Sequence, residues 1–147
     1  MLRRALSVLL VAAPLAALDL VHKATVPTLD WAYHVRSSWW IVLALALVAT
    51  CFALARVPSA AVALAAGVLA GGAAGNLLSA LTSERGIPNP LLVGQETIIA
   101  FNLADVATLL GIALLMGTLV ATTVRNRAQL LPPRAFARML WRRLNPS

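Results

Sequence analysis

The sequence predicts an all-α membrane protein, a four-transmembrane-helix bundle, and three observations lead to this fold class. Hydrophobic residues make up 61% of the 147 residues and charged residues 12%, which is about half the charged share of a soluble domain. The mean hydropathy is +0.86, and the apolar residues gather in four long runs. The charges lie between and after these runs, and the positive ones are unequally distributed.

The four apolar runs are long enough to cross a bilayer, because a spanning helix needs about 20 apolar residues. They cover residues 5–21, 39–55, 60–81 and 98–124. They form a transmembrane domain over residues 1–125, followed by a basic tail over residues 126–147. The third run is rich in glycine and alanine, which lets neighbouring backbones approach closely. We therefore expect the third run to be the central helix, with an irregular outer loop over residues 82–97.

The first run also fits a signal peptide, since it follows two arginines and ends near small residues. Asp19 and Lys23 come directly after its apolar core, and the rest of the chain is itself polytopic. An uncleaved first helix is therefore the simpler interpretation.

Positive charge predicts the orientation, because cytoplasmic segments carry the excess of lysine and arginine. With the N-terminus inside, nine of the 12 Lys and Arg residues are cytoplasmic, and the outer loops hold only Lys23, Arg36 and Arg85. We therefore expect both termini in the cytoplasm. The basic flanks suit the surface of a lipid bilayer, whereas the few aromatic residues and the lack of a basic groove argue against nucleic acid.

The basic tail carries apolar residues at helical spacing with arginines between them, namely Phe136, Met139, Leu140 and Leu144. This pattern is typical of a short helix on the anionic inner leaflet. A disordered tail that only sets the orientation explains the same residues equally well.

Polar residues within the apolar runs are costly and need a reason. Asp105 is placed about two turns into the fourth run, and Asn102 shares its helix face. Asn76 has a similar depth in the third run, so these three side chains are expected to meet near the outer surface. Hydrogen bonding between helices explains the two amides as well as a function does. A buried carboxylate joins helices poorly, so we interpret Asp105 as functional.

Asp19 ends the first run, and Lys23 follows it by one helical turn. This pair can join the polar cluster from another side. Its place near the membrane interface predicts an ordinary solvated ion pair.

The single cysteine, Cys51, excludes an intrachain disulfide. It lies within an apolar run and is interpreted as a packing residue. No residue spacing matches a metal site, so neither a metal nor another cofactor is expected.

The polar residues lie in two motifs, Gly75-Asn76-Leu77-Leu78 and Phe101-Asn102-Leu103-Ala104-Asp105. These resemble the pair that marks signal peptidase II, the lipoprotein signal peptidase family. The second motif, F-N-x-A-D, is matched completely, and the first in its Gly-Asn half. Leu18-Asp19-Leu20-Val21-His22-Lys23 is similar to the family's D-x-x-[ST]-K, with His22 in place of Ser or Thr. The resemblance covers nearly the whole chain and implies a bundle of the signal peptidase II type in a bacterial plasma membrane.

The resemblance implies aspartic proteolysis, in which two aspartates activate a water that attacks the peptide bond before a lipid-modified cysteine. Two neighbouring carboxyls split their pKa values, so that one accepts a proton while the other donates one. Asp105 corresponds to one catalytic aspartate, and the implied partner is a lipid-modified prolipoprotein. The remaining polar residues of the motifs correspond to binding or structural positions, namely Asn76, Asn102, Asp19 and Lys23.

The second catalytic aspartate is missing, because no Asp occurs between Asp30 and Asp105. The corresponding stretch is Gly86-Ile87-Pro88-Asn89-Pro90-Leu91, in which Asn89 is nearest to that position, and an amide cannot transfer the proton. The family's D-R pair is replaced by Ser79-Ala80, and its N-x-G-x-A-F segment is also absent. Glu84 and Glu96 are acids in the same loop that could replace the missing one. His22 and His34 are alternative proton carriers, and each is more simply an interfacial side chain.

Three functions are consistent with these features. The first is a degenerate family member that binds lipoproteins or lipids but no longer cleaves. The second is an active lipoprotein signal peptidase with a diverged pair of acids, and the third is a small transport or scaffold subunit in which Asp105 carries a proton or an ion. The missing acid favours the first, and the complete F-N-L-A-D match disfavours the third.

Overall fold

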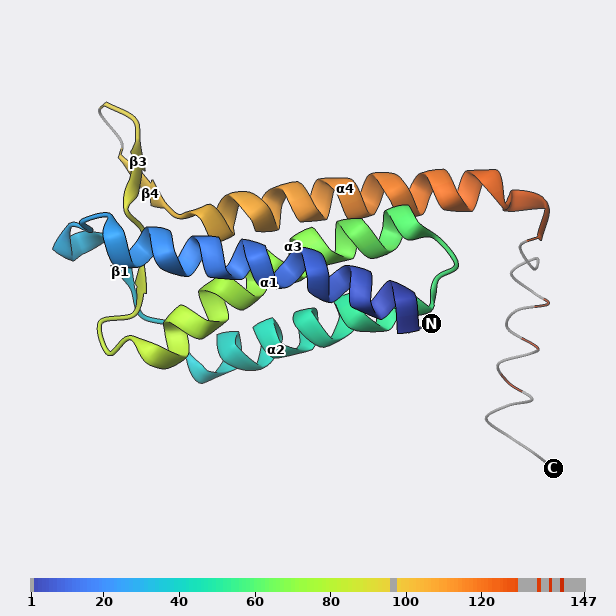
Figure 1. Cartoon of the computed structure of the whole chain (residues 1–147), viewed down its shortest axis with the longest axis horizontal. Coiled ribbons are helices and arrows are strands. Elements are labelled where there is room, and N and C mark those ends of the chain that lie inside the picture. The colour runs from blue at the N-terminus through green and yellow to red at the C-terminus, as the bar shows by residue number, and fades with distance from the viewer. Residues whose placement is uncertain (1, 96–97, 130–134, 136–137, 139–140, 142–147) are drawn as a thin grey trace.

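Four long helices dominate the computed structural model, which describes residues 2–95, 98–129, 135, 138 and 141. They are α1 (Leu2–Thr25), α2 (Ser38–Ala53), α3 (Ala60–Thr82) and α4 (Leu103–Arg125), and they form one elongated bundle (Figure 1). Each is long and apolar enough to cross a membrane, α2 together with the short helix η2 (Leu54–Arg56) that follows it. The prediction of four such helices is confirmed.

Helix α3 is the centre of the bundle, as the sequence predicts. In its apolar stretch 72% of the residues are buried, against 17–22% in the other three helices. Small residues explain this burial, because they let the backbones approach closely. A Cβ atom on Gly71 would lie 2.8 Å from Cβ of Leu15 in α1, and one on Gly72 would lie 2.5 Å from the carbonyl oxygen of Ala104 in α4.

The predicted start of the fourth helix at residue 98 is wrong. Residues Ile99–Phe101 form strand β4, and α4 begins only at Leu103. The apolar run continues unbroken through both elements, so hydropathy cannot separate them. What ends the strand is Asn102, whose side chain accepts a hydrogen bond from the backbone N–H of Asp105 and caps the helix.

The predicted irregular loop, residues 82–97, contributes one strand to each of two short antiparallel pairings. Strand β1 (Tyr33–His34) follows the short helix η1 (Asp30–Ala32) and pairs with β2 (Ile87–Pro88), while β3 (Leu91–Val93) pairs with β4. Gly86 has a φ of 92°, and a Cβ there would lie 2.6 Å from the carbonyl oxygen of His34, so this tight approach favours glycine. All four strands lie at one end of the bundle, which we call the loop end (Figure 1).

The opposite end holds the start of α1, the end of α4 and the α2–α3 connection (Figure 1). Cys51 is fully buried there in an apolar cluster with Val8 and Val62, which confirms its interpretation as a packing residue. Arg4 donates from Nε to the carbonyl oxygen of Ala55 at 2.9 Å. Helix α4 is followed by η3 (Arg127–Gln129), and the predicted apolar face of the tail falls on residues outside the described ones.

Candidate functional site

Asp105 occupies the first turn of α4, at the loop end. Its predicted depth of two turns is therefore wrong, because the helix starts later than the apolar run. The Asp105 backbone N–H donates to Asn102 Oδ1 at 2.9 Å, and the Asn102 backbone N–H donates to Asp105 Oδ2 at 3.1 Å. This reciprocal pair is a capping box, which satisfies two backbone donors that the helix itself leaves free. The three-residue spacing thus reflects a helix cap and not a shared helix face.

Asn76 of α3 brings the second helix to the site. Its Nδ2 donates to Asp105 Oδ1 at 2.8 Å, and its Oδ1 accepts from Asn102 Nδ2 at 3.0 Å. Both amide side chains are buried, while Asp105 stays partly exposed. The prediction that these three residues meet is confirmed, and both carboxylate oxygens of Asp105 have a donor.

The pair Asp19 and Lys23 is buried, so the prediction of a solvated ion pair is wrong. The exposed fractions of the two residues are 1% and 9%. Helix α1 continues through Thr25, which places the pair inside the bundle, and Gly75 leaves room for the carboxylate. Lys23 Nζ lies 2.6 Å from Asp19 Oδ2 and donates to Asn76 Oδ1 at 2.9 Å.

Asp19 and Lys23 join three helices around the site. Asp19 Oδ1 accepts from the backbone N–H of Ala104 at 2.8 Å, which is one of the free donors at the start of α4. Lys23 also donates to Ser79 Oγ at 3.1 Å. The sequence shows Ser79 only as a departure from the family's D-R pair, although its place three residues after Asn76 on the same helix face would have indicated this contact.

Asn89 is brought directly to the cluster, at the position nearest the missing aspartate. It is 2% exposed, and its Oδ1 accepts from Asn102 Nδ2 at 2.5 Å. Its Nδ2 lies 2.7 Å from Nδ1 of His34. The backbone N–H of Asn89 donates to the carbonyl oxygen of Ala32 at 3.1 Å, so the β1–β2 pairing continues up to the site. Because β1 and β2 are far apart in sequence, no local pattern shows that His34 contacts Asn89.

Of the two other candidate acids, Glu84 is described, and it does not supply a second carboxylate on this cluster. Glu84 is exposed in the turn after α3, and none of the hydrogen bonds of the described residues joins it to Asp105. Glu96 falls outside the described residues. His22 has a buried Nδ1 with no hydrogen-bond partner in the described part of the chain. Within that part, no three His, Cys, Asp or Glu side chains gather to hold a metal ion.

A groove of about 330 Å³, the site groove, opens beside Asp105 between α2, α3 and α4. One end carries the polar atoms of Asn76 and Asp105, and the walls are largely apolar. The Arg36 guanidinium lies 5.3 Å from the centre of the Trp40 ring at the α2 side. The lining residues are Arg36, Trp40, Leu43, Ala44, Leu47, Ala73, Asn76, Asp105 and Thr108.

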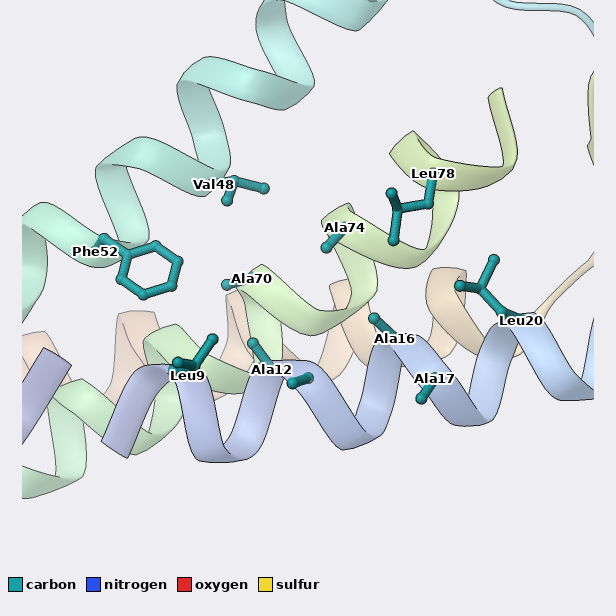
Figure 2. A pocket seen from close by; sticks show the side chains of 11 residues that line it. Leu9, Ala12, Ala16, Ala17, Leu20, Val48, Phe52, Ala70, Ala74 and Leu78 are labelled. Atoms are coloured by element: carbon teal, nitrogen blue, oxygen red, sulfur yellow. The ribbon is translucent and has the colours of Figure 1, made fainter. Parts of the chain in front are cut away.

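A second cavity of about 320 Å³ lies between α1, α2 and α3 (Figure 2). Its floor is formed by alanines of α1 and α3, with Leu9, Phe52 and Leu78 around them. All of its lining side chains are apolar, in contrast to those of the site groove. The second cavity therefore offers no group for acid–base chemistry, and Asp105 faces the other side of α3.

A comparison with known protein families finds no match for this chain, and a comparison with curated proteins finds none either.

Proposed function

We propose that this chain is a signal peptidase II-like membrane protein that binds lipid-modified prolipoproteins in the site groove and does not cleave them. The observation that carries this proposal is the pair of Asp105 and Asn89. Asp105 lines the groove, and Asn89 is joined to Asp105 through the side chain of Asn102.

Aspartic proteolysis needs two carboxyls, one to accept a proton from water and one to donate a proton to the carbonyl. An amide at Asn89 can do neither. Among the described residues, Asp19 is another acid in contact with the cluster, but its oxygens are engaged by the backbone N–H of Ala104 and by Lys23. A buried carboxylate with these partners holds helices in place and is closed to a substrate.

Binding is supported by the shape and chemistry of the site groove. Leu43, Ala44 and Leu47 give it an apolar wall that suits an acyl chain, while Asn76 and Asp105 give one polar end that suits a peptide backbone. Trp40 and Arg36 lie at its α2 side, and both residue types are common at a membrane interface. These features fit a ligand that has an acyl chain and a polar peptide part.

The proposal also includes the orientation of the chain in the membrane. Nine of the 12 lysines and arginines belong to the end opposite the site or to the tail that follows it, and cytoplasmic segments carry this excess. The loop end then faces the outer side of a bacterial plasma membrane, and both termini are cytoplasmic. A lipid-modified precursor would reach the groove from the outer leaflet.

Adjacent alanines of α3 provide a matched test of the binding site. Ala73 lines the site groove, whereas Ala74 lines the second cavity. We expect Ala73→Leu to weaken binding of a diacylglyceryl-modified signal peptide at least about tenfold, because one well-placed side chain in a pocket controls 1–3 kcal/mol. Ala74→Leu leaves the affinity unchanged.

The measurement is a titration of the full chain in nanodiscs with the labelled lipopeptide, beside the same peptide without its lipid. Equal affinity for the two peptides would overturn the proposal, and so would equal effects of the two alanine variants.

An active peptidase is the second candidate, and one observation favours it. Asp105 remains partly exposed to the groove and keeps its cap and its Asn76 partner. Cleavage that depends on Asp105 would establish this alternative.

A further inference from the structure

His34 is the last member of a hydrogen-bond chain that starts at the backbone of α4. The direction of this chain is fixed at Asn102 by two backbone groups. The N–H of Asp105 can only donate, so it must meet Asn102 Oδ1, and the carbonyl oxygen of Pro88 can only accept, so it must meet Asn102 Nδ2. The Asn102 amide therefore has one allowed orientation.

The orientation of Asn89 follows from that of Asn102. Asn102 Nδ2 is a donor, so Asn89 must turn its Oδ1 toward it, at 2.5 Å. The Nδ2 of Asn89 then faces His34 Nδ1, at 2.7 Å. Because an amide nitrogen only donates, Nδ1 of His34 has to accept, and its ring proton has to be on Nε2. Only a neutral imidazole satisfies this contact.

We propose that His34 is a positioning residue of the site and that it acts only as the neutral imidazole. It holds Asn89, and with it β2, against Asn102 and the first turn of α4. When Nδ1 gains a proton, two donors face each other, the contact is lost, and the loop end loosens at Asn89. The effect on ligand binding rests on the proposed function, but the tautomer and the loosening do not.

The charged groups around His34 offer no compensating partner. On its own segment, Arg36 lies over Trp40. Arg85, in the turn before β2, pairs with Asp30 and lies 4.4 Å from the centre of the Tyr33 ring. Glu84 of the same turn is exposed, and Asp105 on α4 accepts from Asn76 and Asn102. Among the described residues no carboxylate is hydrogen-bonded to His34, so protonation removes one hydrogen bond without forming an ion pair.

The test uses His34→Asn, because an asparagine amide can present its oxygen where Nδ1 lies and does not titrate. The matched control is His22→Asn, which changes the second of the two histidines. Lipopeptide affinity of the full chain in nanodiscs is measured at about pH 7.5 and about pH 5, on either side of the range in which histidine changes charge. We expect the wild type and His22→Asn to lose affinity on acidification roughly three- to tenfold more than His34→Asn does, which is the effect of about one hydrogen bond.

The same three proteins give a readout that is independent of the ligand. Heteronuclear NMR of the imidazole nitrogens should show that His34 carries its proton on Nε2 at neutral pH. Amide exchange at Asn89, compared between variants at one pH, should be faster in the wild type than in His34→Asn at about pH 5. A proton on Nδ1 of His34 at neutral pH would overturn the inference. Equal amide exchange rates at Asn89 in the wild type and His34→Asn at about pH 5 would also overturn it. If no protein binds lipopeptide at either pH, the proposed function fails while the NMR and exchange results still decide this inference.

Discussion

At the residue scale, Asn102 joins the start of α4 to α3 and to the segment around β2. Its side chain is 0% exposed, and its Oδ1 caps α4. Its Nδ2 donates to Oδ1 of Asn76, to Oδ1 of Asn89 and to the carbonyl oxygen of Pro88. Its importance is visible in the F-N-L-A-D motif, but its role as a cap is not, because the apolar residues before it continue without a break. The geometry of the site thus depends on a residue whose function the sequence indicates only in part.

Replacing Asn102 with alanine should destabilise the fold by about 2–4 kcal/mol. The change removes a helix cap, worth about 1 kcal/mol, and leaves buried partners at Asn76 and Asn89 unsatisfied, at about 1–3 kcal/mol. The measurement is the unfolding free energy in mixed micelles. Asn126→Ala is the control, since Asn126 is an exposed residue at the other end of α4. Equal losses of unfolding free energy in Asn102→Ala and Asn126→Ala would show that the buried hydrogen bonds of Asn102 do not stabilise the fold.

Asn89→Asp should give the protein the cleaving activity that the proposed function denies to the wild type. A carboxylate at this position can accept from Asn102 Nδ2 as the present amide oxygen does, so the variant is expected to fold. It would supply the second carboxyl that aspartic proteolysis requires. The measurement is release of the signal peptide from a lipid-modified precursor, and the activity should vanish in the double variant that also carries Asp105→Asn. A folded, lipopeptide-binding Asn89→Asp variant without cleavage would show that Asn89 is not the position of the missing acid.

The buried ion pair of Asp19 and Lys23 shows which features of single residues the sequence predicts and which it does not. The spacing of Asp19 and Lys23 predicts their contact, and the structure has it at 2.6 Å. Their burial depends on Gly75 of another helix, which leaves space for the carboxylate. A contact between residues one turn apart is local and predictable, whereas burial by a distant helix is not.

At the scale of elements, the bundle depends on the small residues of α3. They explain why α1 and α4 pack closely against it, and they made its central position predictable from composition. The strands were not predictable. The β1–β2 pairing joins Tyr33 to Pro88, and each strand has only two or three residues, too few for an alternating pattern.

Gly72→Ala should destabilise the bundle by about 1–3 kcal/mol, the usual cost of overpacking a tight contact. Its Cβ would lie 2.5 Å from both the Ala104 carbonyl oxygen and the Thr108 hydroxyl, and the backbone of α4 would have to move. Gly117→Ala is the matched control, because nothing lies within 4 Å of its Cβ. That control should be neutral or gain up to about 1 kcal/mol from helix propensity. The measurement is the unfolding free energy of both variants in the same micelles. If Gly117→Ala lowers it as much as Gly72→Ala does, the close contact between Gly72 and α4 is not the cause.

At the scale of the whole molecule, the two ends of the bundle differ in chemistry. The loop end holds the hydrogen-bonded cluster, the site groove and the acids of the described residues, while most of the positive charge belongs to the opposite end or the tail. Composition and charge were enough to predict the helices and this asymmetry. The groove was not predictable, because it arises where α2 and α4 flank α3 and leave Asp105 accessible between them.

The most direct measurement is the processing of a diacylglyceryl-modified prolipoprotein by the purified wild-type chain, with Asp105→Asn beside it. We expect the wild type to bind the precursor and to leave it intact over the whole time course, as the variant does, because one carboxyl cannot serve as both acid and base in the reaction. Release of the signal peptide by the wild type, abolished by Asp105→Asn, would contradict a binding protein that does not cleave and would establish a working peptidase.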